Sequence, residues 1–153
     1  MPVNCTPYYL RGEGRDAAWI RARVATQNRN RAGAQEHAER FAMGAATRGL
    51  PNNGTVLLVQ NAFPCMDRGA QGGGGCHTWL QSQTRNGLTV YVRVDWDHSN
   101  YSGDHTLLGG MPPMVPMVPR LLRYSRGASQ YFPRTHVVHN LPDIWALEQA
   151  DPD

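Results

Sequence analysis

Three residues in the first half of the chain have the types that bind zinc, and an acidic residue lies beside one of them. The three are His37, Cys65 and Cys76, and the acid is Glu39. One imidazole and two thiolates form a zinc site that leaves a fourth position for water. The metal makes that water acidic enough to supply hydroxide near neutral pH. These residue types therefore predict one catalytic Zn²⁺ bound by the three side chains.

Glu39 is the candidate proton shuttle of this site. It lies two residues after His37, so it can reach the metal-bound water without being forced to bind the metal. From there a carboxylate can take a proton from the water and pass it to a leaving amine. We expect His37 and Glu39 in the first turn of one helix and Cys76 at the start of the next. Helix N-termini favour the thiolate form of cysteine.

The elements that must position these residues follow from the hydrophobic pattern. Apolar periodicity predicts helices over 16–24, 34–48, 76–85 and 142–150, and strands over 55–61, 88–95, 120–125 and 135–139. We expect an irregular or short extended lead-in over 1–14, and loops over 26–33 and the glycine-rich 67–75. The middle of the chain thus alternates helix, strand, helix and strand, which indicates an α/β domain.

The pair H-A-E at 37–39 and P-C…C at 64–76, in the order helix, strand, P-C, helix, strand, resembles the zinc-dependent cytidine deaminase superfamily. The resemblance implies one catalytic domain over 1–153, with a three-layer fold in which helices flank a central mixed sheet. It implies His37, Cys65 and Cys76 as ligands and Glu39 as the shuttle. It also implies a base pocket lined near Ala38 and Phe63.

The spacing of the two cysteines departs from the pattern of that superfamily. Ten residues, MDRGAQGGGG, separate Cys65 from Cys76, where two are usual. The glycines can let the chain bulge out and return, which keeps Cys76 as a ligand, or His77 can replace it. A purely structural zinc site, with Cys5 or His77 as the fourth ligand, also remains open. An odd count of three cysteines argues against a disulfide framework.

The composition suggests a soluble domain with an affinity for nucleic acid. The chain has 153 residues, no apolar run long enough to span a membrane, and 15 basic residues, all of them arginine. Arginine pairs with phosphate and stacks on bases. A GC-rich coding sequence, which favours arginine codons over lysine codons, is the alternative explanation of this composition. Basic residues also alternate with aromatic ones late in the chain, which is how single strands are bound. The residues predicted to bind substrate there are Arg120, Arg123, Tyr124 and Phe132. An ordinary surface with a few core rings is the alternative.

These features together resemble the deaminase toxin domains of bacterial competition systems. That resemblance implies conversion of cytosine to uracil, with single-stranded DNA favoured as the substrate. It also implies a position at the C-terminus of a larger secreted protein, activity in the cytoplasm of the target cell, a cognate immunity protein and no membrane partner. Adenine as the target base, and RNA or duplex DNA as the substrate, stay open. The alternatives in function are a deaminase of free nucleosides or nucleotides and a non-catalytic, zinc-stabilised binding domain.

Overall fold

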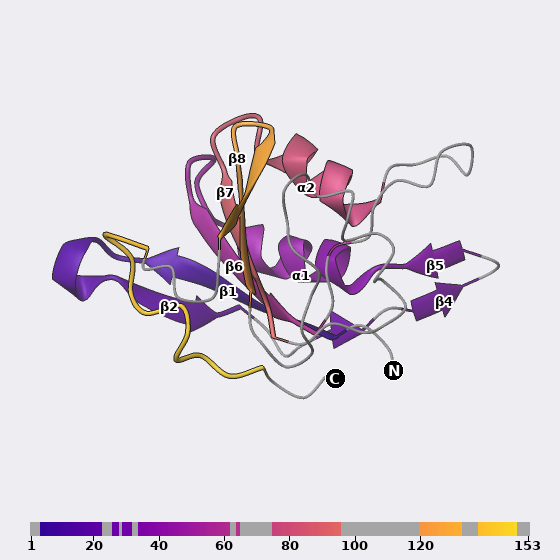
Figure 1. Ribbon diagram of the computed structural model, residues 1–153, viewed down its shortest axis with the longest axis horizontal. Helices are drawn as coiled ribbons and strands as arrows, with labels where there is room; N and C mark the ends of the chain where they lie inside the picture. The colour runs from indigo at the N-terminus through magenta and orange to yellow at the C-terminus, as the bar shows by residue number, and fades with distance from the viewer. Residues whose placement is uncertain are drawn as a thin grey trace.

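The computed structural model describes residues 4–22, 26–27, 29–31, 34–61, 64, 75–95, 120–132 and 138–149. They form a mixed α/β structure in which one large sheet carries two α-helices (Figure 1). The strands are β1 (Asn4–Arg11), β2 (Ala18–Arg21), β3 (Thr26–Gln27), β4 (Arg29–Arg31), β5 (Ala34–Glu36), β6 (Thr55–Gln60), β7 (Thr89–Val94), β8 (Arg120–Ser125) and β9 (Ala128–Phe132). The helices are the 3-10 turn η1 (Gly14–Asp16), α1 (Ala38–Thr47) and α2 (Cys76–Gln83).

The large sheet has the strand order β2-β1-β6-β7-β8-β9, and β3 also pairs with β1. Only β6 and β7 are parallel, in a register from Thr55 opposite Thr89 to Gln60 opposite Val94. A parallel pair needs a long crossover, and the chain between β6 and β7 contains α2. The other pairs of this sheet are antiparallel. Strands β4 and β5 form a separate hairpin.

Both α-helices pack on the same face of the sheet. In α1, the alanines at 38, 42 and 46 recur at a spacing of four and are buried. Their small side chains let the helix approach the sheet closely, and α2 adds Leu80 beside them. The strands present alternate residues to this core, because successive side chains of a strand point to opposite faces. The strand residues buried there are Cys5, Val56, Leu58, Val90, Val92, Val94, Leu122 and Tyr124.

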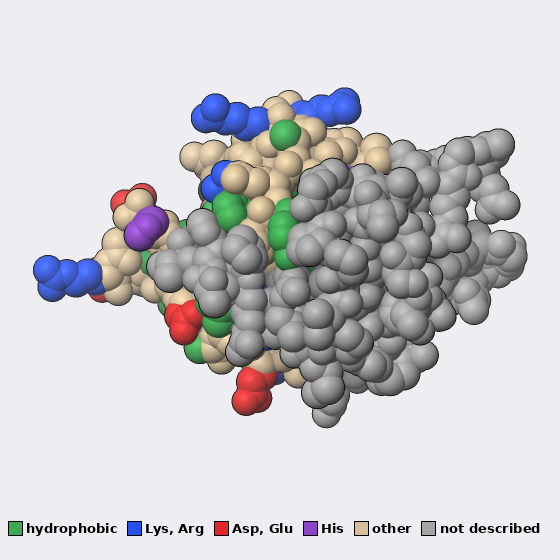
Figure 2. Space-filling model, in the orientation of Figure 1, with side chains coloured by type: hydrophobic (Ala, Val, Ile, Leu, Met, Phe, Trp, Pro, Cys, Tyr) green, Lys and Arg blue, Asp and Glu red, His purple; other side chains and the backbone are tan. Residues whose placement is uncertain are grey.

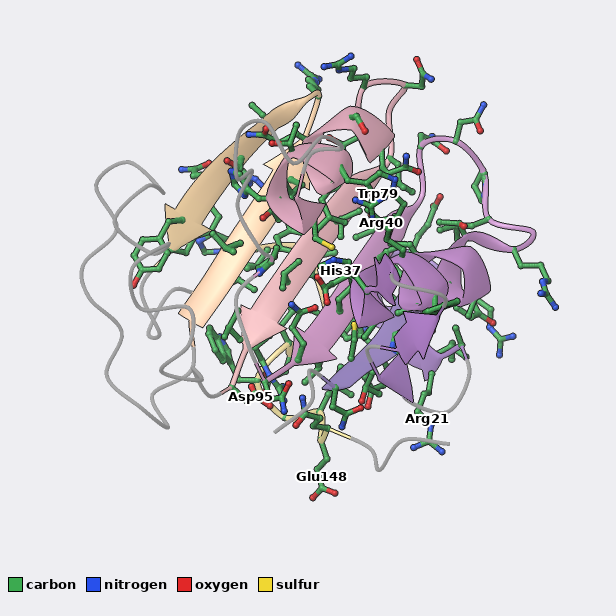
Figure 3. The ribbon with its side chains drawn as sticks, turned by 90° about the vertical axis from the view of Figure 1, so that its right-hand side faces the viewer. Arg21, His37, Arg40, Trp79, Asp95 and Glu148 are labelled. Atoms are coloured by element: carbon green, nitrogen blue, oxygen red, sulfur yellow. The ribbon has the colours of Figure 1, made fainter. Side chains whose placement is uncertain are left out.

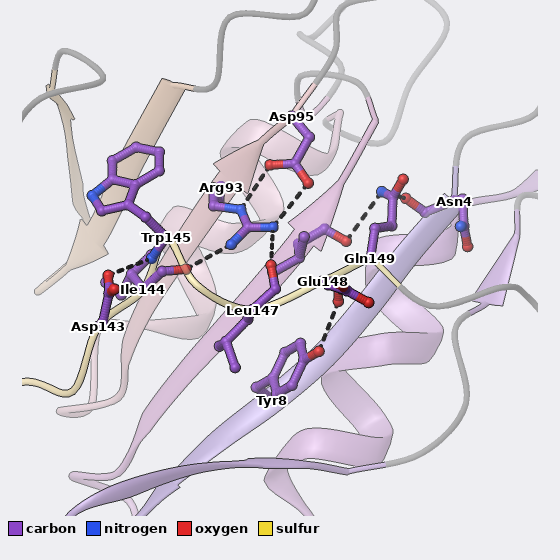
Figure 4. Close-up of polar contacts among 11 residues, drawn as sticks. Asn4, Tyr8, Arg93, Asp95, Asp143, Ile144, Trp145, Leu147, Glu148 and Gln149 are labelled. Carbon is purple, nitrogen blue, oxygen red and sulfur yellow. Dashed lines mark hydrogen bonds and ion pairs between the residues drawn. The ribbon is translucent and has the colours of Figure 1, made fainter.

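An irregular C-terminal segment covers the opposite face of the sheet. Its Ile144 is buried with apolar residues of five strands, namely Tyr8, Leu57, Val59, Tyr91, Leu121 and Phe132. Side chains of the sheet donate hydrogen bonds to its backbone carbonyls (Figure 4). Arg93 donates to Ile144 O at 2.6 Å and to Leu147 O, while the Tyr8 hydroxyl donates to Glu148 O at 2.8 Å. Asp95 pairs with the same guanidinium at 2.7 Å.

The strands predicted at 55–61, 88–95 and 120–125 and the helices predicted at 34–48 and 76–85 are confirmed with small changes of boundary. The first helix begins only at Ala38, because 34–36 form β5. The lead-in is a full strand that lies inside the sheet. The predicted 26–33 loop contains β3 and β4. Residues 135–137 and 67–74 lie outside the described residues, and 138–139 are not in a strand.

Two predicted helices are wrong. Residues 18–21 of the first form β2, which pairs with β1 and thereby completes the backbone hydrogen bonds that a helix would otherwise make. Gly12 allows the connecting turn, since its φ is +85° and a Cβ there would lie 2.6 Å from Asp16 O. Residues 142–149 of the second are irregular. Side chains of the sheet, those of Arg93 and Tyr8, donate hydrogen bonds to backbone carbonyls of this segment.

The α/β class predicted from the sequence is confirmed. In the described part of the chain, however, helices lie on only one face of the sheet, with the irregular segment on the other. No helix among the described residues is long and apolar enough to cross a membrane.

Candidate metal centre

The starts of α1 and α2 bring three side chains of complementary chemistry together. His37 is the N-cap of α1, with extended backbone angles of φ −87° and ψ 137°, and Glu39 is the second helical residue. Cys76 is the first residue of α2, after the N-cap Gly75. One potential ligand atom from each of the three lies within 4.8 Å of the others. His37 and Glu39 precede Cys76 by 39 and 37 positions in the sequence, yet the three side chains meet at one point. This group could hold a metal ion.

The group is mostly enclosed. Cys76 has no exposed surface and Glu39 is 2% exposed, whereas His37 is partly exposed. Two potential anions buried side by side favour a cation between them, because each alone is costly to bury. The first turn of a helix also favours negative charge, and both Glu39 and Cys76 occupy a first turn. Nitrogen and sulfur donors suit zinc, and the carboxylate is acceptable to it.

The structure brings together two of the three predicted ligands and the predicted shuttle. Cys65 and Phe63 lie outside the described residues, and between them only Pro64, which is buried, is described. The predicted site is therefore described at His37, Glu39 and Cys76 only.

Cys76 and His77, the two candidates for the third ligand, differ in their surroundings. Cys76 belongs to the group, and His77 does not. The Nδ1 atom of His77 instead lies 2.7 Å from the Tyr124 hydroxyl, and the two rings meet edge to face at 5.3 Å between centroids. The ring is 7% exposed and tied to β8.

Cys5 lies near the same group but is not part of it. It has no exposed surface, and burial together with the nearby Glu39 carboxylate raises the pKa of its thiol well above 9.0. Cys5 is not among the three residues whose ligand atoms lie within 4.8 Å of one another. Of the two cysteines in the described ranges, Cys5 and Cys76, neither forms a disulfide.

The predicted nucleic-acid surface needs correction. Tyr124 has no exposed surface and Phe132 is 8% exposed, so both rings are core and cannot stack on an incoming base. Arg123 lies 5.1 Å over the Phe132 ring on the face of the sheet opposite the helices. The side chain of Arg120 lies outside what the structure describes. Ala38 is fully buried, with its methyl group in the core.

Among the side chains that are described on the face drawn in Figure 2, the arginines stand apart from one another and form no continuous patch. A different pair lies beside the candidate metal centre (Figure 3). The guanidinium of Arg40 on α1 lies 5.1 Å from the ring centroid of Trp79 on α2. Sequence reasoning missed this pair. The one available clue is spacing, because Arg40 follows His37 by three residues and Trp79 follows Cys76 by three.

The order of elements that carries the resemblance to cytidine deaminases is present as α1, β6, Pro64, α2 and β7. Comparison with protein-family models, with curated proteins and with solved structures finds no match. Function must therefore be argued from the site itself.

Proposed function

We propose that the chain is a zinc-dependent deaminase that converts cytosine to uracil in nucleic acid by hydrolysis. The observation that carries the proposal is the meeting of His37, Glu39 and Cys76 within 4.8 Å at the starts of two helices. These are two of the ligands and the proton shuttle that the H-A-E and P-C…C pattern implies. The order of the elements around them supports the same assignment.

The residues fit a zinc ion. His37 and Cys76 supply one nitrogen and one sulfur, and Cys65 is the third ligand by its place after Pro64. Zinc held there supplies Lewis acidity that makes water nucleophilic near neutral pH. A site of three protein ligands keeps a position open for that purpose.

Glu39 performs the proton transfers. Hydrolysis joins the oxygen of water to C4 of cytosine and breaks the bond from C4 to the exocyclic nitrogen, which leaves as ammonia. Glu39 transfers the two protons of that water in turn, one to ring N3, where uracil carries it, and one to the departing nitrogen. Its carboxylate lies within 4.8 Å of the ligand atoms of His37 and Cys76, which places it within reach of a water bound at the site.

The proposed substrate is cytosine in single-stranded DNA, which presents an unpaired base at the least cost. An all-arginine set of basic residues supports a polyanionic substrate. The proposal includes action as a bacterial toxin, delivered by secretion into the cytoplasm of a target cell and neutralised by an immunity protein.

A non-catalytic, metal-stabilised domain is the second candidate. The near-complete burial of Glu39 and Cys76 favours it, because structural zinc sites are closed and use four protein ligands. In that case Glu39 would be a ligand and its removal would release the metal.

The experiment is Glu39→Gln in the zinc-loaded protein, with Glu13→Gln on the exposed turn η1 as the matched control. Zinc content is measured together with uracil formation in single-stranded DNA, duplex DNA, RNA and free cytidine. The proposal expects full zinc content and a loss of turnover of at least roughly a hundredfold in Glu39→Gln. Loss of zinc in this variant, or an inactive wild type, would favour the binding domain. Activity on free cytidine alone would identify a nucleoside deaminase.

A further inference from the structure

Arg40 and Trp79 join the two helices that carry the candidate metal centre. Arg40 is the third residue of α1 and is exposed, while Trp79 is the fourth residue of α2 and is partly buried. The guanidinium lies 5.1 Å from the ring centroid, within the range of a cation–π contact. Trp79 also packs against the core, so the ring is a fixed support for the arginine.

The pair stands directly beside the candidate metal centre. Residues three apart on a helix lie on the same side of it, so Trp79 lies one turn above Cys76. The backbone N–H of Arg40 donates to His37 O at 3.2 Å, which places Arg40 over His37 in the same way. Figure 3 shows His37, Arg40 and Trp79 in succession at the adjoining ends of the two helices. His37 is also the one partly exposed member of the group.

The chemistry of the pair suits a phosphate group. A guanidinium is always charged and presents a planar fork of donors that matches phosphate oxygens. An aromatic ring beneath it holds the plane in one orientation, which lowers the entropy lost on binding. An exposed arginine held in this way beside a partly exposed site is placed to bind an anionic part of whatever enters.

We propose that Arg40, supported by Trp79, binds a phosphate group that flanks the target base. The inference rests on the proposed deaminase function and names the part of the substrate that this surface recognises. The phosphate can belong to a DNA strand or to a free nucleotide, and the experiment separates these sources.

Another arginine stacked on an aromatic ring provides a contrast. Arg123 lies at the same distance, 5.1 Å, from the ring of Phe132. It faces the side of the sheet that the segment 138–149 covers, together with Tyr91 opposite it on β7. The sheet separates it from His37, so a base at the metal centre cannot bring its own phosphate to Arg123. Arg40, in contrast, lies next to His37 on the helix side of the sheet.

A purely structural role for the pair makes a different prediction. If Arg40 only fastens α1 to α2, its removal lowers stability and affects all substrates equally. If it binds phosphate, its removal discriminates between substrates with and without a phosphate. The ratio of kcat/KM for phosphorylated and unphosphorylated substrates is therefore the decisive readout.

The test uses the zinc-loaded full chain with deoxycytidine, its 5′-phosphate, its 3′-phosphate and a short single-stranded oligodeoxynucleotide. The variants are Arg40→Gln, Arg40→Lys and Trp79→Phe. Arg48→Gln, at the exposed far end of α1 about 12 Å along the helix, and Arg85→Gln, exposed after α2, are the matched controls. Each removes one positive charge without touching the pair.

For Arg40→Gln, we expect kcat/KM for at least one nucleoside phosphate and for the oligonucleotide to fall by roughly tenfold relative to deoxycytidine, the loss of one charge-assisted contact. Arg40→Lys should recover part of that loss, and Trp79→Phe should show a smaller loss. A loss confined to the oligonucleotide assigns the phosphate to a strand. An equal loss on all substrates, or the same loss in Arg48→Gln, would overturn the proposal.

A binding measurement keeps this inference separate from the proposed chemistry. If the wild type deaminates none of the substrates, the proposed function fails, and fluorescence anisotropy of a labelled oligonucleotide still tests the phosphate contact. Weaker binding by Arg40→Gln than by Arg48→Gln, at equal zinc content, supports it. Equal binding by the two variants, or none by the wild type, refutes it.

Discussion

The Nδ1 atom of His77 lies 2.7 Å from the hydroxyl of Tyr124, inside the layer between α2 and the sheet. This contact ties the helix that begins at Cys76 to β8, far from it in the chain. The hydroxyl in this contact belongs to Tyr124, whose ring is predicted from the sequence to stack on a base. The contact therefore supports the position of Cys76 and accounts for the burial of Tyr124.

Tyr124→Phe tests that relationship. The variant removes a hydrogen bond from a buried ring pair, so we expect the free energy of unfolding to fall by about 1–3 kcal/mol. Zinc content and oligonucleotide affinity should be kept, because the ring never reaches solvent. Denaturant unfolding and anisotropy measure the two effects, with Tyr9→Phe on β1 as the control. Weaker oligonucleotide binding at unchanged stability would instead show that the Tyr124 hydroxyl contacts the nucleic acid.

Zinc content after cysteine replacement tests the ligand set. We expect about one zinc per chain in the wild type. Cys76→Ala and Cys65→Ala should each lose the metal and lower the melting temperature. Cys5→Ala should retain the metal, since Cys5 lies outside the group. Atomic spectroscopy decides the matter, and full zinc content in Cys76→Ala would contradict the assignment.

The stability of the fold should fall at high pH, partly through Tyr8. Burial is the largest cause that raises the pKa of Tyr8 above its usual 10.0, and its hydroxyl donates to Glu148 O. The folded state therefore favours the protonated form. The contribution of Tyr8 to the free energy of unfolding is complete below pH 10, and it is lost as the pH rises through the higher pKa of the folded state.

Tyr8→Phe should make the alkaline decline shallower, although Cys5, whose pKa is also raised, still contributes to it. Below pH 9 the variant should be less stable by about 1 kcal/mol through the lost hydrogen bond. Urea unfolding between pH 7 and 11 gives both quantities. Parallel curves for wild type and variant across that range would show that Tyr8 does not titrate differently on folding.

Arg93→Ala tests how the C-terminal segment is attached. The substitution removes a buried guanidinium that donates to the carbonyls of Ile144 and Leu147 and pairs with Asp95. We expect a loss of about 3 kcal/mol and faster proteolytic cleavage within 138–149. Arg11→Ala, on the exposed end of β1, is the control. Zinc content should not change, because the segment lies on the face opposite the metal centre.

Local sequence determined the elements that carry the candidate site. The run TVLLVQ is short, apolar and rich in β-branched residues, which predicts the buried strand β6, and the alanines at 38, 42 and 46 define one face of α1. The local pattern also places H-A-E near a helix start, although pairing of β5 with β4 moves that start from 34 to 38. Such features depend on residues close in the chain, so composition and spacing predict them.

Contacts between distant residues decided the rest. Strand register puts Tyr124 in the core on the helix side and Arg123 on the other side, because adjacent strand residues face opposite ways. Residues 142–149 have the apolar spacing of a helix, yet Arg93 and Tyr8 on the sheet donate hydrogen bonds to backbone carbonyls of this irregular segment. Arg40 meets Trp79 only because α1 and α2 pack side by side on that sheet. No local pattern encodes these pairings, since each depends on how far-separated segments pack against one another.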